Sequence, residues 1–297
     1  MSTLPPELEQ RILLLAAEID RPDAARLLLV AWRVKAWVEP LVYSALLIYR
    51  RRLVDNPYIS RGIPSLTPED LYELTPRKPF LGDAVRNLLL LRVSSAEAHH
   101  IIGLFPHIRE LCYQSSSEAY NALNLLHAGS LRHLSGNVDH LLSPYQHAGL
   151  DGRAALANVT HLGIHYTHAI HALLLPALRL PQLTHLAVFP MTAENLFFEN
   201  AHLSDLLVKY LIPTGALRVF IIVQSHHTRR DDVYGGETAL DPRLAANPAF
   251  VVFPQGIGDA RTDWSLRATG GRDFWQRAEE FIESRRRGEV HSCFYDQ

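Results

Sequence analysis

Three histidines occupy the same place in a short phrase that recurs along the chain: His133, His161 and His185. Imidazole nitrogens are common zinc ligands, and a catalytic zinc site uses three protein ligands and keeps one position open. However, side chains in one column of a sheet point in parallel rather than toward one centre, and no acidic partner is obvious among the nearest positions. We therefore predict no metal and no cofactor. A partner-binding patch and a solvated face both stay open as interpretations of the column.

No other motif indicates a reaction. Cys112 would lie one strand from His133, but no orienting acid or oxyanion arrangement can be named beside it. The sequence contains no phosphate loop, no GxSxG, no HExxH and no paired CxxC. We assign no catalytic residue and expect a protein that is not an enzyme.

The phrase that carries the histidines has apolar residues at its first, fourth and sixth places, with Gly136 as the one exception. Its six copies are VRNLLL from Val85, IRELCY from Ile108, LRHLSG from Leu131, VTHLGI from Val159, LTHLAV from Leu183 and LRVFII from Leu217. Successive copies are 23, 23, 28, 24 and 34 residues apart. Each copy predicts a short strand followed by a helical or irregular return, and stacked copies predict a solenoid with a parallel sheet.

This pattern resembles leucine-rich repeats over about residues 85–223, although the Asn or Cys that usually follows the phrase is missing here. The resemblance implies an α/β array of degenerate repeats. The alternative is that the phrases are strands of an ordinary doubly wound α/β domain.

If the fourth residue of each phrase points into the core, the third residue and the one after the sixth point onto the open, concave face. That face would bind a protein target. The predicted target-binding residues are Glu110, Gln114, His133, Asn137, His161, His165, His185 and Phe189.

The N-terminal residues form a different pattern. The stretch from Leu4 to Ile19 predicts a helix with Leu8 and Ile12 on one apolar face, and residues 20–43 predict a second helix. Leu4-Pro5-x-Glu7-Leu8-x-x-x-Ile12 followed by Leu28-x-Val30-x-x-x-Val34-x-x-Trp37 resembles an F-box. With Val34 to Tyr43 (VKAWVEPLVY) and Asp273 to Ile282 (DFWQRAEEFI), the whole chain is similar to the F-box-like proteins of mushroom-forming fungi.

This resemblance implies docking onto the Skp-type adaptor of a cullin-RING (SCF-type) ubiquitin ligase and recruitment of a protein target to that ligase. The adaptor-binding residues that it implies are Leu4, Pro5, Leu8, Ile12, Leu15, Leu28 and Val30. One alternative is a ligase-independent repeat scaffold in which the same helices only cap the repeats. Another is a metal-binding protein or enzyme that uses the histidine column.

The predicted organisation has four parts. Residues 1–48 form the F-box-like helical module, and residues 49–84 form a linker with a short helix behind Thr67. Residues 85–253 form the repeat array, including a long loop at 224–249 and a last strand in AFVVFP. Residues 254–297 form a C-terminal cap with an amphipathic helix.

Amino-acid composition limits the partners that the protein can bind and the cell compartments in which it is expected. The 297 residues are 47% hydrophobic and carry a net charge of −2, so no global field would hold nucleic acid or an anionic membrane. No apolar run approaches the roughly 20 residues of a membrane helix. Two cysteines cannot form a disulfide framework, which favours a reducing compartment, cytoplasmic or nuclear.

Overall fold

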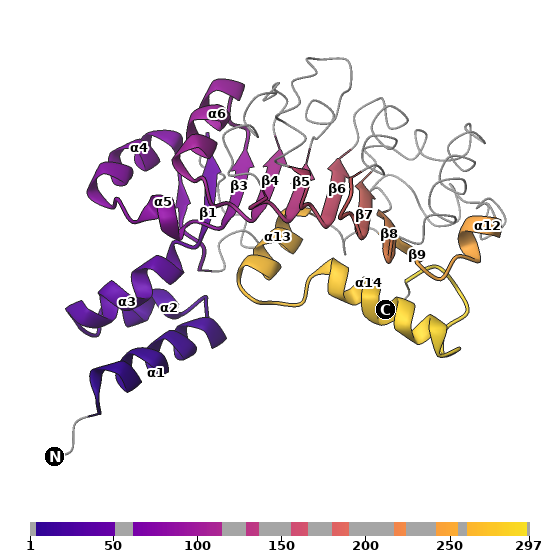
Figure 1. The fold of residues 1–297 in the computed structure, drawn as a ribbon, viewed down its shortest axis with the longest axis horizontal. Helices are drawn as coiled ribbons and strands as arrows, with labels where there is room; N and C mark the ends of the chain where they lie inside the picture. The colour runs from indigo at the N-terminus through magenta and orange to yellow at the C-terminus, as the bar shows by residue number, and fades with distance from the viewer. Residues whose placement is uncertain are drawn as a thin grey trace. The chain divides into compact units, whose positions relative to one another are not determined.

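The computed structural model describes residues 4–50, 62–114, 129–136, 156–165, 180–189, 217–223, 242–254 and 260–295 (Figure 1). The chain is an α/β protein whose strand pairings are parallel within each of two compact units. The first unit comprises Met1–Leu131 and Arg261–Arg272, and the second comprises Arg132–Ala260 and Asp273–Gln297.

Each of the six recurring phrases forms a strand that begins at its third residue, so the six predicted strands are confirmed. They are β3 (Asn87–Leu91), β4 (Glu110–Gln114), β5 (His133–Gly136), β6 (His161–His165), β7 (His185–Phe189) and β8 (Val219–Val223). Equivalent positions of the phrase pair with one another, for example His133 with His161 and His161 with His185. The repeat therefore sets the register of the strands as well as their positions.

The first unit contains two strands that the sequence did not predict, β1 (Ala45–Tyr49) and β2 (Ser65–Leu66), in the order β2-β1-β3-β4. β1 is a further copy of the phrase, because Ala45 aligns with the third residue of the β3 copy. Tyr43 stands in its first place, where the other copies have an aliphatic residue. The prediction of a purely helical segment up to residue 48 is therefore wrong at its end.

Three helices form the N-terminal module of this unit: α1 (Pro6–Ile19), α2 (Ala24–Leu27) and α3 (Trp32–Val42). The single helix expected over residues 20–43 is split, because Ala31 adopts an extended backbone before α3. The module has its own apolar core, made of Ala17, Ala24, Val34 and Val38 with Leu13, Leu14, Leu27, Leu28, Trp37, Leu41 and Val42 packed around them. An ion pair of 2.8 Å between Arg33 of α3 and Glu9 of α1 joins the two longer helices.

The described part of the first unit has four further helices: α4 (Pro68–Arg77), α5 (Leu81–Ala84), α6 (Ser95–Leu104) and α13 (Ala260–Ala268). Figure 1 shows α4, α5 and α6 grouped beside β1 and β3. The C-terminal segment α13 packs on the strands through Trp264, which is fully buried with Leu47 and Leu89. Residues more than 200 positions apart in the sequence therefore share one core.

The predicted helix start behind Thr67 is confirmed, and a second helix of this unit begins in the same way. The Thr67 hydroxyl caps α4, and Ser94 caps α6. Ser94 Oγ accepts from the Glu97 backbone N–H at 3.3 Å, while a Glu97 carboxylate oxygen accepts from the Ser94 N–H at 2.6 Å. This reciprocal capping box satisfies two backbone donors that would otherwise lack partners in the helix.

We expect Ser94→Ala to lower the free energy of unfolding by about 1 kcal/mol, the usual value of an N-cap hydroxyl. Urea denaturation followed by circular dichroism measures this change. Ser94→Thr keeps the hydroxyl and should retain most of the stability. An equal loss in the threonine variant would contradict a capping role.

The second unit contains β5 to β8 followed by β9 (Phe250–Phe253), in the order β5-β6-β7-β8-β9, together with α12 (Pro242–Ala245) and α14 (Phe274–Arg286). β9 and α14 confirm the predicted last strand and C-terminal helix. The Asp273 carboxylate caps α14 by accepting from the Gln276 N–H at 2.9 Å. At the other end, Arg285 donates to the carbonyls of Ala245 and Phe250, and burial lowers the pKa of this guanidinium.

The strands of the second unit are buried on both faces where α14 covers them. β7 and β8 are buried along their whole length, as in parallel sheets with a layer on each side. The apolar side of α14, with Trp275, Ala278 and Ile282, packs against Phe189 and Ile221. The third residue of the phrase and the one after the sixth, which were expected on an open face, therefore form a core with this helix in β7 and β8.

Candidate functional site

An exposed apolar stripe runs along α1. Its members follow one another at intervals of three or four residues, which places them on one side of the helix. They are Leu8, Ile12 and Leu15, together with Leu4 just before the helix, each 49–58% exposed, and Ile19, which is 77% exposed. The opposite side of α1 packs into the core of the module through Leu13, Leu14 and Ala17. The helix is thus apolar on both sides, and only one of them is buried within the described residues.

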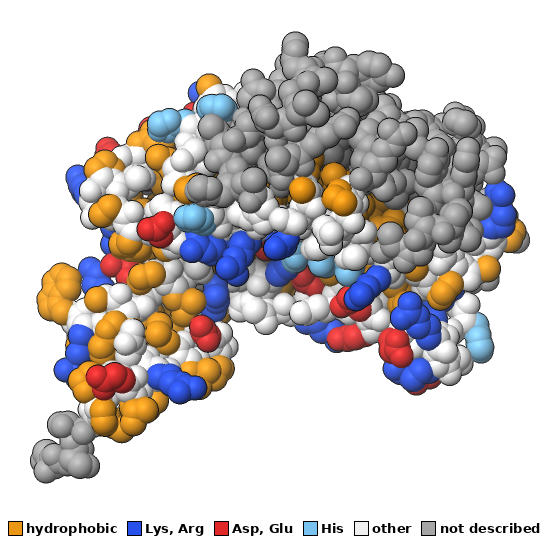
Figure 2. All heavy atoms as spheres, viewed as in Figure 1, with side chains coloured by type: hydrophobic (Ala, Val, Ile, Leu, Met, Phe, Trp, Pro, Cys, Tyr) orange, Lys and Arg blue, Asp and Glu red, His pale blue; other side chains and the backbone are white. Residues whose placement is uncertain are grey.

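The turn between α2 and α3 extends the exposed apolar surface. Leu29, Val30 and Trp32 are 88%, 65% and 84% exposed, and Lys35 Nζ lies 4.9 Å from the centre of the Trp32 ring. Figure 2 shows hydrophobic side chains across this part of the molecule. We call the set Leu4, Leu8, Ile12, Leu15, Ile19, Leu29, Val30 and Trp32 the apolar stripe.

The structure places the predicted adaptor-binding residues as follows. Leu4, Pro5, Leu8, Ile12, Leu15 and Val30 are exposed, whereas Leu28 packs against the core of the module. Ile19, Leu29 and Trp32 belong to the same surface but were not predicted. Ile19 continues the spacing of the stripe from Leu15, so the periodicity could have revealed it. The exposure of Leu29 and Trp32 depends on the break between α2 and α3.

Arg21 fastens the module to the rest of the first unit. Its guanidinium donates to Ser44 Oγ at 2.9 Å and to the carbonyl of Ala268 at 3.1 Å. Burial lowers the pKa of Arg21. These contacts tie the turn after α1 to the start of β1 and to the end of α13.

The second candidate site is the histidine column of the second unit. The rings of His161 and His185 stack, with centres 4.0 Å apart and planes only 12° from parallel, and the His133 ring lies 4.1 Å from His161 with its plane tilted by 35°. The Trp275 ring of α14 meets His161 and His185 edge-on, at centre distances of 5.3 and 5.6 Å. We call His133, His161 and His185 the histidine stack.

Threonines hold the rings of the stack from one side. The Thr160 and Thr184 hydroxyls lie 2.8 Å from Nδ1 of His161 and His185, respectively. On the other side, His185 Nε2 lies 3.0 Å from a Glu279 carboxylate oxygen of α14. Burial lowers the pKa of His185, and the Glu279 carboxylate opposes this shift without reversing it.

The stacking distance limits how many rings can be charged together. Two unit charges 4 Å apart repel by about 1 kcal/mol in bulk water and by about 4 kcal/mol at an effective dielectric constant of roughly 20. Simultaneous protonation of two neighbouring rings of the stack is therefore unfavourable.

The expectation that the predicted target-binding residues lie on an open face is wrong for three of them. His185 and Phe189 are buried under α14, and Glu110 is buried beside α13. Gln114, His133, His161 and His165 are half-buried, and Asn137 lies outside the described residues. The reason is that the apolar sides of the two C-terminal helices bury the odd positions of the strands.

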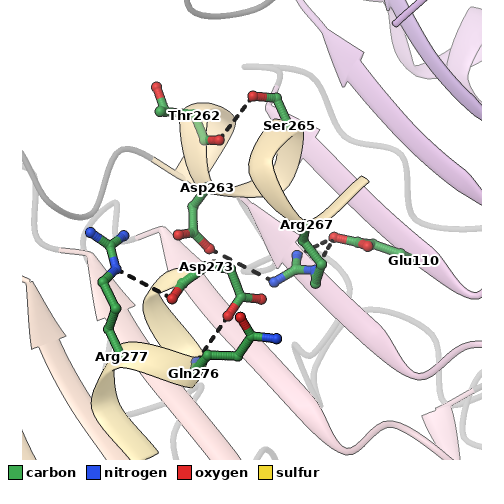
Figure 3. Close-up of polar contacts among 8 residues, drawn as sticks. All are labelled: Glu110, Thr262, Asp263, Ser265, Arg267, Asp273, Gln276 and Arg277. Atoms are coloured by element: carbon green, nitrogen blue, oxygen red, sulfur yellow. Dashed lines mark hydrogen bonds and ion pairs between the residues drawn. The ribbon is translucent and has the colours of Figure 1, made fainter. Parts of the chain in front are cut away.

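Glu110 takes part in a buried ion-pair network (Figure 3). Arg267 of α13 donates to its carboxylate through Nε at 2.7 Å and also through Nη2, and Arg267 Nη1 lies 3.8 Å from Asp263. The Glu110 and Asp263 side chains are only 6% and 1% exposed. In the structure, Glu110 therefore holds α13 on the strands of the first unit.

The histidine stack does not have the geometry of a zinc site. The three rings lie face to face, parallel or tilted by 35°, whereas metal ligands must converge on one ion. Among the described residues, no group of three or more His, Cys, Asp and Glu side chains could hold a metal ion. In the same part of the chain, no helix has the length and apolar character needed to cross a membrane.

Comparison with protein-family models, with curated proteins and with solved structures finds no match to this chain.

Proposed function

We propose that this chain is the substrate-recruiting receptor of a cullin-RING (SCF-type) ubiquitin ligase. Its three N-terminal helices bind a Skp-type adaptor, and the strands that follow, arranged as a leucine-rich-repeat-like solenoid, present a protein target. Neither step needs a cofactor or a catalytic residue in this chain.

The apolar stripe is the observation that carries this proposal. Eight large apolar side chains exposed together on one small helical module are unusual for a surface that only meets water. The module has its own core, so the stripe is not needed to hold its helices together. A helical partner with an apolar face of its own would bury the stripe, as apolar helix faces and grooves do in helix-mediated recognition.

Target recognition is assigned to the part of the strands that the C-terminal helices leave accessible. His133, His161 and His165 are half-buried and lie on adjacent strands. Histidine combines an aromatic face with two polar nitrogens, which suits a mixed apolar and polar contact.

The second candidate function is a ligase-independent scaffold in which the helical module only caps the repeats. The contacts of Arg21 with Ser44 and Ala268 favour it, because they fasten the module to the strands as a cap requires. A cap alone leaves the exposure of the apolar stripe unexplained.

Binding to a purified Skp-type adaptor from a fungal host tests the proposal. We expect the wild-type chain to capture the adaptor and Leu8→Asp and Ile12→Asp each to weaken binding at least tenfold, because each places a carboxylate in the apolar contact. Glu18→Lys changes the charge of an exposed residue of the same helix that does not belong to the stripe, and should bind like the wild type. Circular dichroism confirms that the variants remain folded.

Failure of the wild-type chain to bind the adaptor would contradict the receptor function and leave the scaffold. Equal loss of binding in Glu18→Lys would show that the stripe is not the contact surface.

A further inference from the structure

The second unit joins a helix to a set of titratable rings. α14 contributes Trp275, whose ring meets His161 and His185 edge-on, and Glu279, whose carboxylate forms a hydrogen bond with Nε2 of His185. The same helix covers the apolar face of β7 to β9. The contacts that hold α14 on the sheet therefore include two rings of the histidine stack.

The charged groups that face His185 come from three sides. Glu279 and Asp273 approach from α14, Arg218 lies just before β8, and His161 stacks from β6. The two carboxylates favour a proton on His185, whereas Arg218 and a protonated His161 disfavour it. Burial under α14 also disfavours it, since a charged ring loses its hydration there.

The net balance in the docked state disfavours the proton, because the pKa of His185 is lowered. When α14 leaves the sheet, the ring regains water and its pKa returns toward the ordinary value of about 6.5. The undocked state then binds protons more tightly than the docked state. The docking of α14 is therefore strongest above about pH 6.5 and weakens as the pH falls below this value.

We propose that the histidine stack is a pH-dependent latch, which holds α14 on the sheet near neutral pH and releases it on acidification. Release uncovers the apolar face of the second unit, including Phe189, Ile221 and Val223. This inference concerns the second unit alone and does not depend on adaptor binding.

Hydrogen exchange of the full chain between pH 7.5 and pH 5.0, read by mass spectrometry, tests the latch. The exchange rate of the α14 amides is divided by that of the α6 amides at each pH, which removes the intrinsic pH dependence. We expect this ratio to rise about fivefold or more on acidification, because protonation of His185 favours the undocked state, in which its ring is hydrated. His291→Gln, which removes an exposed histidine of the same unit, should show the same rise.

Two single-charge variants sharpen the test because they should move the midpoint of this rise in opposite directions. Glu279→Gln removes an anion that favours the proton and should shift the midpoint to lower pH. Arg218→Gln removes a cation that disfavours it and should shift the midpoint to higher pH. A merely structural role of either side chain would change the exchange rate at every pH without these opposed shifts.

Two results would overturn the latch. One is a constant α14 to α6 ratio across the pH range in the wild-type chain. The other is a rise whose midpoint moves in the same direction, or does not move, in Glu279→Gln and Arg218→Gln.

Discussion

Arg267→Ala is expected to lower the free energy of unfolding of the first unit by about 3–5 kcal/mol, the usual cost of leaving a buried charge without its partner. The change leaves the Glu110 carboxylate, which is almost completely buried, without the guanidinium that it contacts. It also detaches α13 from the strands that its Trp264 helps to bury. Urea denaturation measures the loss, and hydrogen exchange of the β4 amides assigns it to this unit.

Two comparisons distinguish the stability lost with the buried ion pair from the stability lost by removing any arginine side chain. Arg26→Ala removes a guanidinium from an exposed pair with Asp23 in the same unit and should cost under about 1 kcal/mol. Replacing both partners, as Glu110→Leu with Arg267→Met, should cost much less than Arg267→Ala, because neither residue then leaves an unpaired charge. If the double variant is as unstable as Arg267→Ala, the loss does not come from the stranded Glu110 carboxylate.

Trp275→Ala is expected to lower the stability of the second unit by about 3–5 kcal/mol, the range found when a buried aromatic residue is truncated. The ring is 5% exposed and touches two histidines of the stack as well as Phe274. Its removal leaves a cavity between α14 and the strands. The measurement is again urea denaturation, with exchange of the α14 amides as the local reading.

Trp32→Ala is the matched control for this second prediction. Trp32 is 84% exposed in the first unit, so its truncation should change stability by no more than about 0.5 kcal/mol. The same variant should weaken adaptor binding if the apolar stripe is the contact surface. Equal instability of Trp32→Ala and Trp275→Ala would contradict the burial of Trp275 under α14.

The strands illustrate what local sequence can predict. A repeated phrase with apolar residues at fixed places marks every strand from β3 to β8 and even its first residue, because the strand period of two leaves few alternative registers. The copy at β1 does not fit the predicted pattern, because Tyr43 stands in its first place, where the other copies have an aliphatic residue. The caps at Thr67 and Ser94 are also features that local sequence can predict, since a cap depends on neighbours only three positions away.

The candidate sites depended much more on distant contacts. The histidine column was predicted from the phrase, and its register is confirmed by the pairing of His133, His161 and His185. Its expected open face was wrong, because that prediction treated the C-terminal helix as a cap on the last strand. In the structure α14 packs across β7, β8 and β9, which places His185 and Phe189 in a core.

The sequence by itself determined the elements whose information is local: the strand phrase with its register, the capped helices, and the spacing that lines up Leu8, Ile12 and Leu15 on one side of α1. Only the tertiary structure decided which apolar surfaces are covered. Periodicity shows that a face is apolar, but the helix that buries it can come from anywhere in the chain. Residues 260–286 return to cover the strands, whereas no described residue covers the apolar stripe. That difference, set by packing between distant segments, turns one apolar face into a core and leaves the other as the proposed binding surface.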